Sequence, residues 1–211
     1  MGRLYCLMGK SASGKDTVYR RLLADEALGL KQIVPYTTRP IRQGEQEGRE
    51  YHFTDAAGLT ALQEQGKVIE ARVYHTVHGD WHYFTADDGQ FDLEAGDCLM
   101  IGTLEAYLQI RKYFAEKTGQ AKENADLVVP LYIEVEDGLR LSRALERERQ
   151  QTEPKYKELC RRFLADSEDF SEEKLEEAGI AVRYDNTELE ACLKRIRDTI
   201  GRPERSAGCP G

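Results

Sequence analysis

The stretch "MGKSASGKDT", residues 8–17, constrains the fold of this chain more than any other. Gly9, four intervening residues, Gly14 and Lys15 match the pattern GxxxxGK. The apolar run "LYCLM" precedes the pattern, and a helical pattern begins at Lys15. A strand, a glycine-rich loop and a helix in this order form a cradle for phosphate, because the loop turns its backbone N–H groups inward and the helix adds its positive end.

Eight residues of this stretch are candidates for binding the phosphates of ATP. Glycines allow the backbone to approach the phosphates closely, and the lysine ammonium lies against the outer phosphates. The candidates are Gly9, Ser11, Ala12, Ser13, Gly14, Lys15, Asp16 and Thr17. The alternative is a strand-to-helix turn, rich in glycine and serine, that binds no ligand.

The residues after Lys15 depart from the commonest form of the loop. Asp16 stands where a serine or threonine often reaches Mg²⁺, and the hydroxyl follows one place later at Thr17. A hydroxyl at this place resembles the GKGT form of nucleoside monophosphate kinases. Asp16 and Thr17 are therefore candidate Mg²⁺ ligands, since this ion prefers carboxylate and phosphate oxygen. Asp16 could equally serve to favour the N-terminus of the helix.

Short apolar runs alternate with longer amphipathic ones along the chain, which predicts an α/β fold with a central parallel sheet flanked by helices. The runs "RLYCLMG", "KQIVPY", "DCLMIG" and "DLVVPLYIEV" are the expected strands. Helical patterns cover residues 103–116, 137–151, 156–166 and 187–200. Between them, "GREYHF", "KVIEARVYHTV" and "WHYFT" predict a small strand-rich insertion. The tail after Ile200 has the composition of a frayed end.

Charge and composition exclude several classes of function. The net charge of −8 argues against a broad surface for nucleic acid or for an anionic membrane. We find neither a signal-peptide pattern nor an apolar run of membrane-spanning length, so we expect a cytoplasmic protein. The five cysteines show no metal-binding or disulfide spacing, and we expect reduced thiols, with Cys6 and Cys98 in the core.

A second group of chemically active residues lies in "TTRPIRQGEQEGREYHF", residues 37–53. Arg39 and Arg42 are three residues apart, and Glu45 and Tyr51 follow. Two guanidinium groups can grip one phosphate, and a tyrosine hydroxyl adds a neutral donor. A charged surface loop would explain the arginines, but not their occurrence together with Glu45, two glycines and Tyr51.

Together these motifs resemble the guanylate kinase family, whose members phosphorylate GMP with ATP. The pattern TTRxxRxGExxGxxYxF lies between the glycine-rich loop and a later "VIE", as in that family. The resemblance implies a P-loop kinase fold in three parts. These are a core of residues 1–35, 96–136 and 171–211, an insertion of residues 36–95 that binds GMP, and a helical lid of residues 137–170. It also implies Mg²⁺ with ATP as the cofactor, and small-molecule nucleotides as the partners.

The resemblance also assigns roles to individual residues. Arg39, Arg42 and Tyr51 would hold the phosphate of GMP, with Tyr83 as a second phenol and Glu45 as support. Glu70 would accept hydrogen bonds from guanine, and Thr85 would touch the edge of the base. These assignments give the GMP-binding set Arg39, Arg42, Glu45, Tyr51, Glu70, Tyr83 and Thr85. Without the motif, Glu70 reads as a solvent-facing glutamate beside Arg72.

The predicted lid is rich in arginine. Arg140, Arg143 and Arg147 share one helical face, Arg149 follows, and Arg161 and Arg162 begin the next segment. In the family, lid arginines neutralise the phosphoryl group during transfer. The resemblance favours Arg147, Arg149 and Arg162, which join Lys15 and Arg39 as candidate catalytic residues. A solvated charged face is the usual meaning of such runs.

Several positions depart from the family. Pro35 replaces a serine that usually touches the base, and Ile101 and Thr103 stand where two aspartates are expected. The segment between Glu70 and Tyr83 is also longer than usual. Two alternatives therefore stay open beside a guanylate kinase. One is the same kinase chemistry on another acceptor, and the other is a phosphopeptide-binding module without catalysis.

Overall fold

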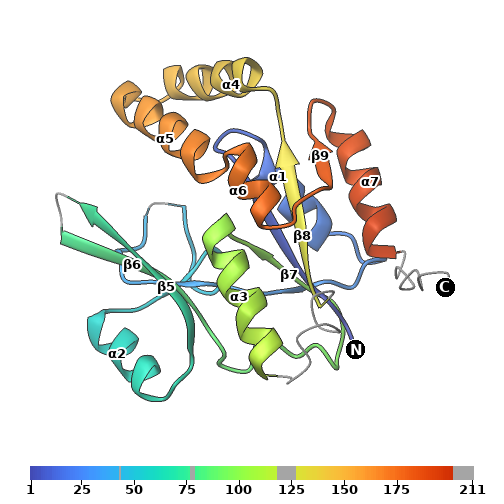
Figure 1. Cartoon of the computed structure of the whole chain (residues 1–211). Coiled ribbons are helices and arrows are strands. Elements are labelled where there is room, and N and C mark those ends of the chain that lie inside the picture. The colour runs from blue at the N-terminus through green and yellow to red at the C-terminus, as the bar shows by residue number, and fades with distance from the viewer. Residues whose placement is uncertain (43, 77–78, 118–126, 202–211) are drawn as a thin grey trace. The chain divides into compact units, whose positions relative to one another are not determined.

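The computed structural model describes residues 1–42, 44–76, 79–117 and 127–201. The chain forms two compact units. Unit 1 comprises residues 1–6 and 31–129, and unit 2 comprises residues 7–30 and 130–211. Their strands and helices are drawn in Figure 1. The three-part division expected from the sequence stays a prediction.

The central sheet has five strands in the order β2-β7-β1-β8-β9. They are β1 (Leu4–Gly9), β2 (Lys31–Gln32), β7 (Cys98–Ile101), β8 (Val128–Glu134) and β9 (Arg183–Asp185). β2 pairs parallel with β7, and β8 pairs parallel with β9. All six residues of β1 are buried, as expected for a strand that reads as one continuous apolar run. The predicted α/β class with a central parallel sheet is confirmed.

In unit 2, α7 (Leu189–Gly201) and α1 (Lys15–Leu23) each bury an apolar face. In α7 the buried residues Cys192, Leu193, Ile196 and Ile200 recur at helical spacing. α1 buries Val18, Tyr19 and Leu22 and packs against α7. In unit 1, α3 (Leu104–Lys117) buries five residues and packs against the hairpin described next.

Unit 1 carries the strand-rich insertion as a second sheet, with the order β4-β3-β6-β5. β5 (Val68–Thr76) and β6 (Gly79–Ala86) form an antiparallel hairpin, and β3 (Tyr36–Thr37) pairs parallel with β4 (His52–Phe53). Leu59 of α2 (Ala56–Glu64) packs with Phe84 and Ala86 to cover this sheet. Residues 77–78 of the hairpin lie outside the described part of the chain.

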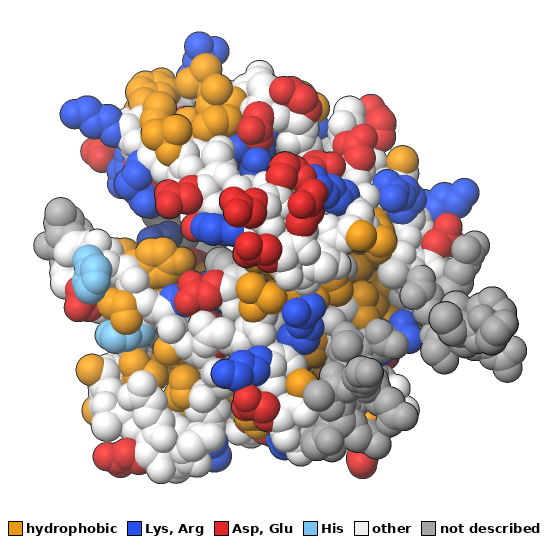
Figure 2. All heavy atoms as spheres, in the orientation of Figure 1, with side chains coloured by type: hydrophobic (Ala, Val, Ile, Leu, Met, Phe, Trp, Pro, Cys, Tyr) orange, Lys and Arg blue, Asp and Glu red, His pale blue; other side chains and the backbone are white. Residues whose placement is uncertain are grey.

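The segment predicted as the lid forms two helices, α4 (Asp137–Arg149) and α5 (Tyr156–Asp169), separated at "TEP" as expected. A further helix, α6 (Glu172–Glu177), forms between the helical patterns predicted at residues 156–166 and 187–200. Ser171 caps α6 by accepting a hydrogen bond from the Lys174 N–H. Acidic side chains gather over α6 in Figure 2.

Three cysteines are buried, Cys6, Cys98 and Cys192, and Cys160 is exposed. The four cysteines in the described part of the chain have free thiols. Burial raises the pKa of Cys6 to about 12 and that of Cys192 to about 11. Cys6 and Cys98 are therefore core residues, as expected. None of the helices described here is long and apolar enough to cross a membrane. The tail after Gly201 lies outside the described residues.

Candidate nucleotide-binding sites

Two glycines of the loop between β1 and α1 are required by close contacts. A Cβ atom on Gly9 would lie 2.7 Å from the carbonyl oxygen of Ile133. Gly14 precedes α1 with a φ of 83°, and a Cβ atom there would lie 2.5 Å from Asn186 Nδ2. Both glycines let the loop lie against neighbouring strands and turns of unit 2, which fixes its backbone in the shape of a cradle.

Ala12 is the only non-glycine residue with a positive φ in the described chain, at 62°. This left-handed conformation crowds the Cβ atom of an L-residue against its own backbone. The strain falls in the middle of the phosphate-binding loop. A conformation of this kind persists only where the surrounding structure enforces it, and such positions cluster at ligand sites.

A cavity of about 240 Å³ lies over the start of α1. It is lined by Ala12, Gly14, Lys15, Asp16, Thr17, Arg143 and Arg147. The first N–H groups of a helix have no intrahelical partner, so α1 adds donors to three cationic side chains. Arg143 and Arg147 are one turn apart on α4, and both reach this cavity. The cavity thus brings together a loop and two arginines that suit a chain of phosphates.

Two buried polar atoms beside this cradle lack a hydrogen-bond partner in the described part of the chain. They are Ser13 Oγ and Asn186 Oδ1. The Asn186 side chain donates to the Ser13 carbonyl oxygen at 2.8 Å, and Arg143 donates to the Asn186 carbonyl oxygen at 3.2 Å. Unsatisfied buried groups are rare in folded proteins, so their concentration here is what a site built around a polar ligand would show. No motif in the sequence pointed to Asn186.

Arg140 has a different role from its neighbours on α4. Its side chain is 1% exposed, and its Cζ lies 4.2 Å from the centre of the Phe163 ring. Its guanidinium donates to Asp137 at 2.9 Å, to Asp166 at 3.2 Å and to the Ser11 carbonyl oxygen at 3.2 Å. Asp166 also accepts the Ser11 N–H at 2.8 Å. Arg140 therefore connects α4 and α5 to the loop through hydrogen bonds. It does not line the cavity over the start of α1, which we call the phosphate cavity.

The other two predicted lid arginines are placed differently from Arg147. Arg162 is exposed and pairs with Glu158 at 3.6 Å. It lines a small hollow together with Arg147 and Ser11. Arg149 is exposed at the end of α4 and lines neither this hollow nor the phosphate cavity. Arg143, which the sequence showed only as part of a charged face, takes the position at the cavity.

In unit 1, Arg39 is the centre of the predicted grip on the acceptor phosphate. Its side chain is 3% exposed, and Glu45 binds it with both carboxylate oxygens at 2.6 and 2.7 Å. Arg39 Nε donates to the Tyr83 hydroxyl at 3.0 Å. Burial opposes the charge of Arg39, but the hydrogen bonds to Glu45 and Tyr83 raise its pKa. The same bonds from Arg39 hold the pKa of Glu45 below its usual value.

Aromatic rings surround this guanidinium. The Tyr51 ring centre lies 5.1 Å from Arg39 Cζ, and Tyr51 meets Tyr83 edge-on with ring centres 5.5 Å apart. Burial, and then the neighbouring Tyr83, raises the pKa of Tyr51, so its hydroxyl stays protonated as a donor. Arg42 is exposed, with its Cζ 5.9 Å from the Trp81 ring centre, and its backbone N–H donates to Glu45 at 2.8 Å. Arg39, Glu45, Tyr51 and Tyr83 are thus brought together.

Glu70 and Thr85, the predicted contacts of the base, face each other across β5 and β6. Thr85 donates to Glu70 at 2.7 Å, and both residues are buried. The reading of Glu70 as a solvent-facing residue is therefore wrong. Arg72 binds Glu70 through Nε at 2.9 Å and through Nη2 at 3.3 Å, and its Nη1 donates to Thr103 Oγ1 at 3.1 Å.

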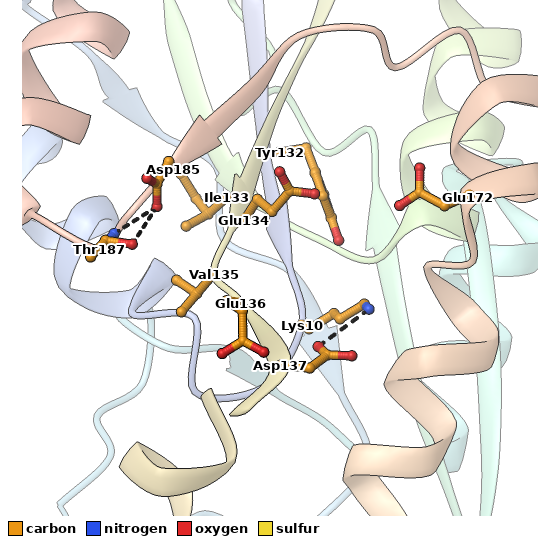
Figure 3. Close-up of a pocket in the computed structure, with 10 residues that line it drawn as sticks. All are labelled: Lys10, Tyr132, Ile133, Glu134, Val135, Glu136, Asp137, Glu172, Asp185 and Thr187. Atoms are coloured by element: carbon orange, nitrogen blue, oxygen red, sulfur yellow. Dashed lines mark hydrogen bonds and ion pairs between the residues drawn. The ribbon is translucent and has the colours of Figure 1, made fainter. Parts of the chain in front are cut away.

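A second cavity of unit 2, of about 440 Å³, has an acidic lining. Figure 3 shows Glu134, Glu136, Asp137, Glu172 and Asp185 around it, with Lys10 bound to Asp137. Five carboxylates would repel a phosphate group, so this cavity does not suit a nucleotide phosphate. Among the residues described, no group of three or more His, Cys, Asp or Glu side chains could hold a metal ion.

Comparisons with known proteins find similarity to guanylate kinases. The family model for guanylate kinase matches residues 1–82. A guanylate kinase of Rhodopseudomonas palustris (strain HaA2) is 42% identical over 79 residues, which is 37% of this chain and 36% of that protein. A guanylate kinase of Aromatoleum aromaticum is 34% identical over 120 residues, or 56% of each chain. The chain thus spans between about a third and a little over half of the length of these curated relatives.

One solved structure matches nearly the whole chain. It is the guanylate kinase from Anaplasma phagocytophilum, with a TM-score of 0.61 and 17% sequence identity, covering 95% of this chain and 85% of that one. At this identity the likeness concerns the fold. The resemblance predicted from the motifs is therefore confirmed, because residues 1–82 match the guanylate kinase family in sequence and the chain as a whole has the fold of a guanylate kinase.

Proposed function

We propose that this protein is a nucleoside monophosphate kinase that transfers the γ-phosphoryl group of ATP to GMP, giving ADP and GDP. The observation that carries the proposal is the cavity in which Lys15, Arg143 and Arg147 meet the phosphate-binding loop. The match of residues 1–82 to guanylate kinases supports GMP as the acceptor.

In unit 2, the chain's own groups bind and orient the triphosphate. The loop and the N-terminus of α1 supply N–H donors, and Lys15 supplies a point charge at the outer phosphates. Arg143 and Arg147 then neutralise charge that develops on the oxygens of the transferred group. Arg143 is fixed by its bonds to the carbonyl oxygens of Asn186 and Thr187, which aligns it before the reaction.

Asp16 and Thr17 would hold the Mg²⁺ that accompanies ATP. Both line the phosphate cavity, and their oxygens suit a hard cation. One or two protein oxygens are enough, since Mg²⁺ in such sites takes its remaining ligands from phosphates and water. When bound, Mg²⁺ would neutralise part of the negative charge of the phosphates. The alternative role of Asp16, at the N-terminus of α1, stays open.

In unit 1, Arg39 with Tyr51 and Tyr83 would bind the phosphate of the acceptor, and Arg42 would close the grip. Glu45 fixes Arg39 so that little of its conformational freedom remains to be lost when the phosphate binds. In the transfer, an oxygen of the acceptor phosphate forms a bond to the γ-phosphorus as the bond from that phosphorus to the β-phosphate oxygen breaks, and ADP leaves. Positioning and charge neutralisation carry this chemistry.

A phosphopeptide-binding module has no need for a triphosphate cavity with Lys15 and two arginines. The retained cavity therefore supports the enzyme over the binding module. Another acceptor than GMP stays open, because Pro35, Ile101 and Thr103 depart from the family pattern.

The test is a coupled assay of ADP release from ATP and Mg²⁺ across GMP, dGMP, AMP, CMP, UMP and dTMP. We expect turnover with GMP, and a loss of about 10²-fold or more in Lys15→Ala. Lys31→Ala is the matched control, because Lys31 is a half-exposed lysine that pairs only loosely, at 3.8 Å, with Asp92. Lack of turnover with every acceptor would refute the proposal.

A further inference from the structure

One face of the β5–β6 hairpin carries both the phosphate grip and the base contacts. Arg72 lies directly opposite Tyr83, and Glu70 lies opposite Thr85. Residues two apart on a strand point to the same side and are about 7 Å apart, so Arg72 lies beside Glu70 on β5. Across the hairpin it faces Tyr83, whose hydroxyl binds Arg39 in the phosphate grip. The charge of Arg72 also acts on the Tyr51 hydroxyl, which belongs to the phosphate grip.

The hydrogen bonds among Glu70, Arg72, Thr85 and Thr103 leave more N–H donors than acceptor positions free for a ligand. Glu70 receives two bonds from Arg72 and one from Thr85, while a carboxylate has about four acceptor positions. In the part of the chain that the structure describes, Arg72 uses one N–H on each of its three nitrogens. A guanidinium has five N–H groups, so one on Nη1 and one on Nη2 remain for a ligand.

The exposed fractions of the Glu70 and Arg72 side chains also favour a ligand contact with Arg72. The Glu70 side chain is 0% exposed, whereas that of Arg72 is 13% exposed. Burial opposes the charge of Arg72, but the neighbouring Glu70 raises its pKa, so the guanidinium stays charged. A ligand on this face therefore meets the N–H donors of Arg72, whereas the Glu70 carboxylate behind them has no exposed surface.

Given the kinase activity proposed above, we propose that Arg72 is the residue that reads the acceptor base, by donating to O6 and N7 of a 6-oxopurine. Arginine bound to these two atoms is the commonest specific contact of proteins with guanine in nucleic acids, and the same atoms are present in GMP. Glu70 and Thr103 then act as positioning residues that hold the fork of Arg72. Adenine binds less well at this site, because it keeps the N7 acceptor but its 6-amino group turns a donor toward the donors of Arg72.

This reading leaves the 2-amino group of guanine without an acceptor. GMP and IMP share O6 and N7 and differ only in the 2-amino group, so both are substrates. A site in which Glu70 bound the amine itself would behave differently. A site built to bond a substrate N–H rejects the analogue that lacks it by about 10⁴-fold, because its own buried group is left unpaired.

The experiment compares kcat/KM for GMP, IMP and AMP in the wild-type protein. We expect IMP within tenfold of GMP, and AMP lower than both by roughly 5- to 150-fold, the discrimination of one bidentate contact. If GMP is turned over but kcat/KM for IMP is lower than that for GMP by about 10³-fold or more, the role of Arg72 is overturned and the kinase activity stands. Absence of turnover with all three would overturn the proposed function, and this inference with it.

Arg72→Lys is the informative variant, because lysine keeps a cation beside the buried Glu70 but loses the fork. We expect kcat/KM for GMP and IMP to fall together by about tenfold or more, with AMP little changed. The matched control is Arg111→Lys on α3, an arginine whose Cζ lies 5.3 Å from the centre of the Tyr107 ring and whose Nη1 donates to the Tyr107 hydroxyl. An unchanged ratio of GMP to AMP in Arg72→Lys, with the fold intact by circular dichroism, would contradict the assignment.

Discussion

Replacing Arg140 by methionine tests whether this arginine stabilises unit 2 rather than binding phosphate. Its side chain is 1% exposed and bonds to Asp166, whose own side chain is 16% exposed. Breaking a buried ion pair from one side costs about 3–5 kcal/mol, because the remaining charge is buried without its partner. We therefore expect the free energy of unfolding to fall by about 4 kcal/mol. With a urea m-value of roughly 2 kcal/mol per molar, the midpoint falls by about 2 M.

Arg161→Met is the matched control for this measurement. Arg161 also forms an ion pair within a helix, with Glu158 at 2.7 Å, but its side chain is 63% exposed. Such a surface pair contributes about 0.2–1 kcal/mol. Adding Asp166→Asn to Arg140→Met removes the stranded charge while keeping an acceptor for the Ser11 N–H, so part of the loss returns. Equal, small midpoint shifts in Arg140→Met and Arg161→Met would refute the reasoning.

Three further predictions follow from the described contacts. Ala12→Gly relieves the positive φ of 62° and raises the free energy of unfolding by up to about 1 kcal/mol, measured by thermal melting; a lower melting temperature would contradict it. Because Arg39 lowers the pKa of Glu45, this carboxylate stabilises the fold fully above its ordinary value of 4.5, and the stability is lost as the pH falls through the lower folded value. Between pH 7 and 3, the free energy of unfolding measured in urea should therefore fall less in Glu45→Gln than in the wild-type protein. The same pH dependence in both proteins would count against the pairing of Glu45 with Arg39. Arg147→Ala lowers kcat by about 10²-fold with Arg161→Ala as the control, and equal kcat values would remove Arg147 from the site.

The parts that the sequence predicted well depend on local patterns. The residues of the glycine-rich loop and of the helix after it follow one another closely in the sequence, and the arginines of α4 do so among themselves. Within each of these segments the spacing alone fixes which side chains share a face. The antiparallel β5–β6 hairpin follows in the same way from neighbouring β-branched and aromatic runs. Helix α4 begins at Asp137 as predicted, and it ends at Arg149, two residues before the predicted end.

The parts that the sequence did not predict depend on partners far along the chain. Arg140 is buried and bonds to Asp166, which lies 26 residues farther along the chain on the next helix. No local signal in the sequence separates Arg140 from Arg143 or Arg147. Glu70 and Arg72 were expected to be neighbours, but the sequence did not show that Arg72 also donates to Thr103, 31 residues farther along the chain. The short strand β9 and the helix α6 have too few residues to show a period of their own.

The measurement that tests the central claim most directly follows the phosphoryl group itself. ATP labelled with ³²P at the γ-position is incubated with GMP, Mg²⁺ and the full-length protein, and the products are separated by thin-layer chromatography. The account predicts labelled GDP in the same amount as the ADP formed, and its loss in Lys15→Ala. Label that stays in ATP, or that appears only in inorganic phosphate, would contradict it.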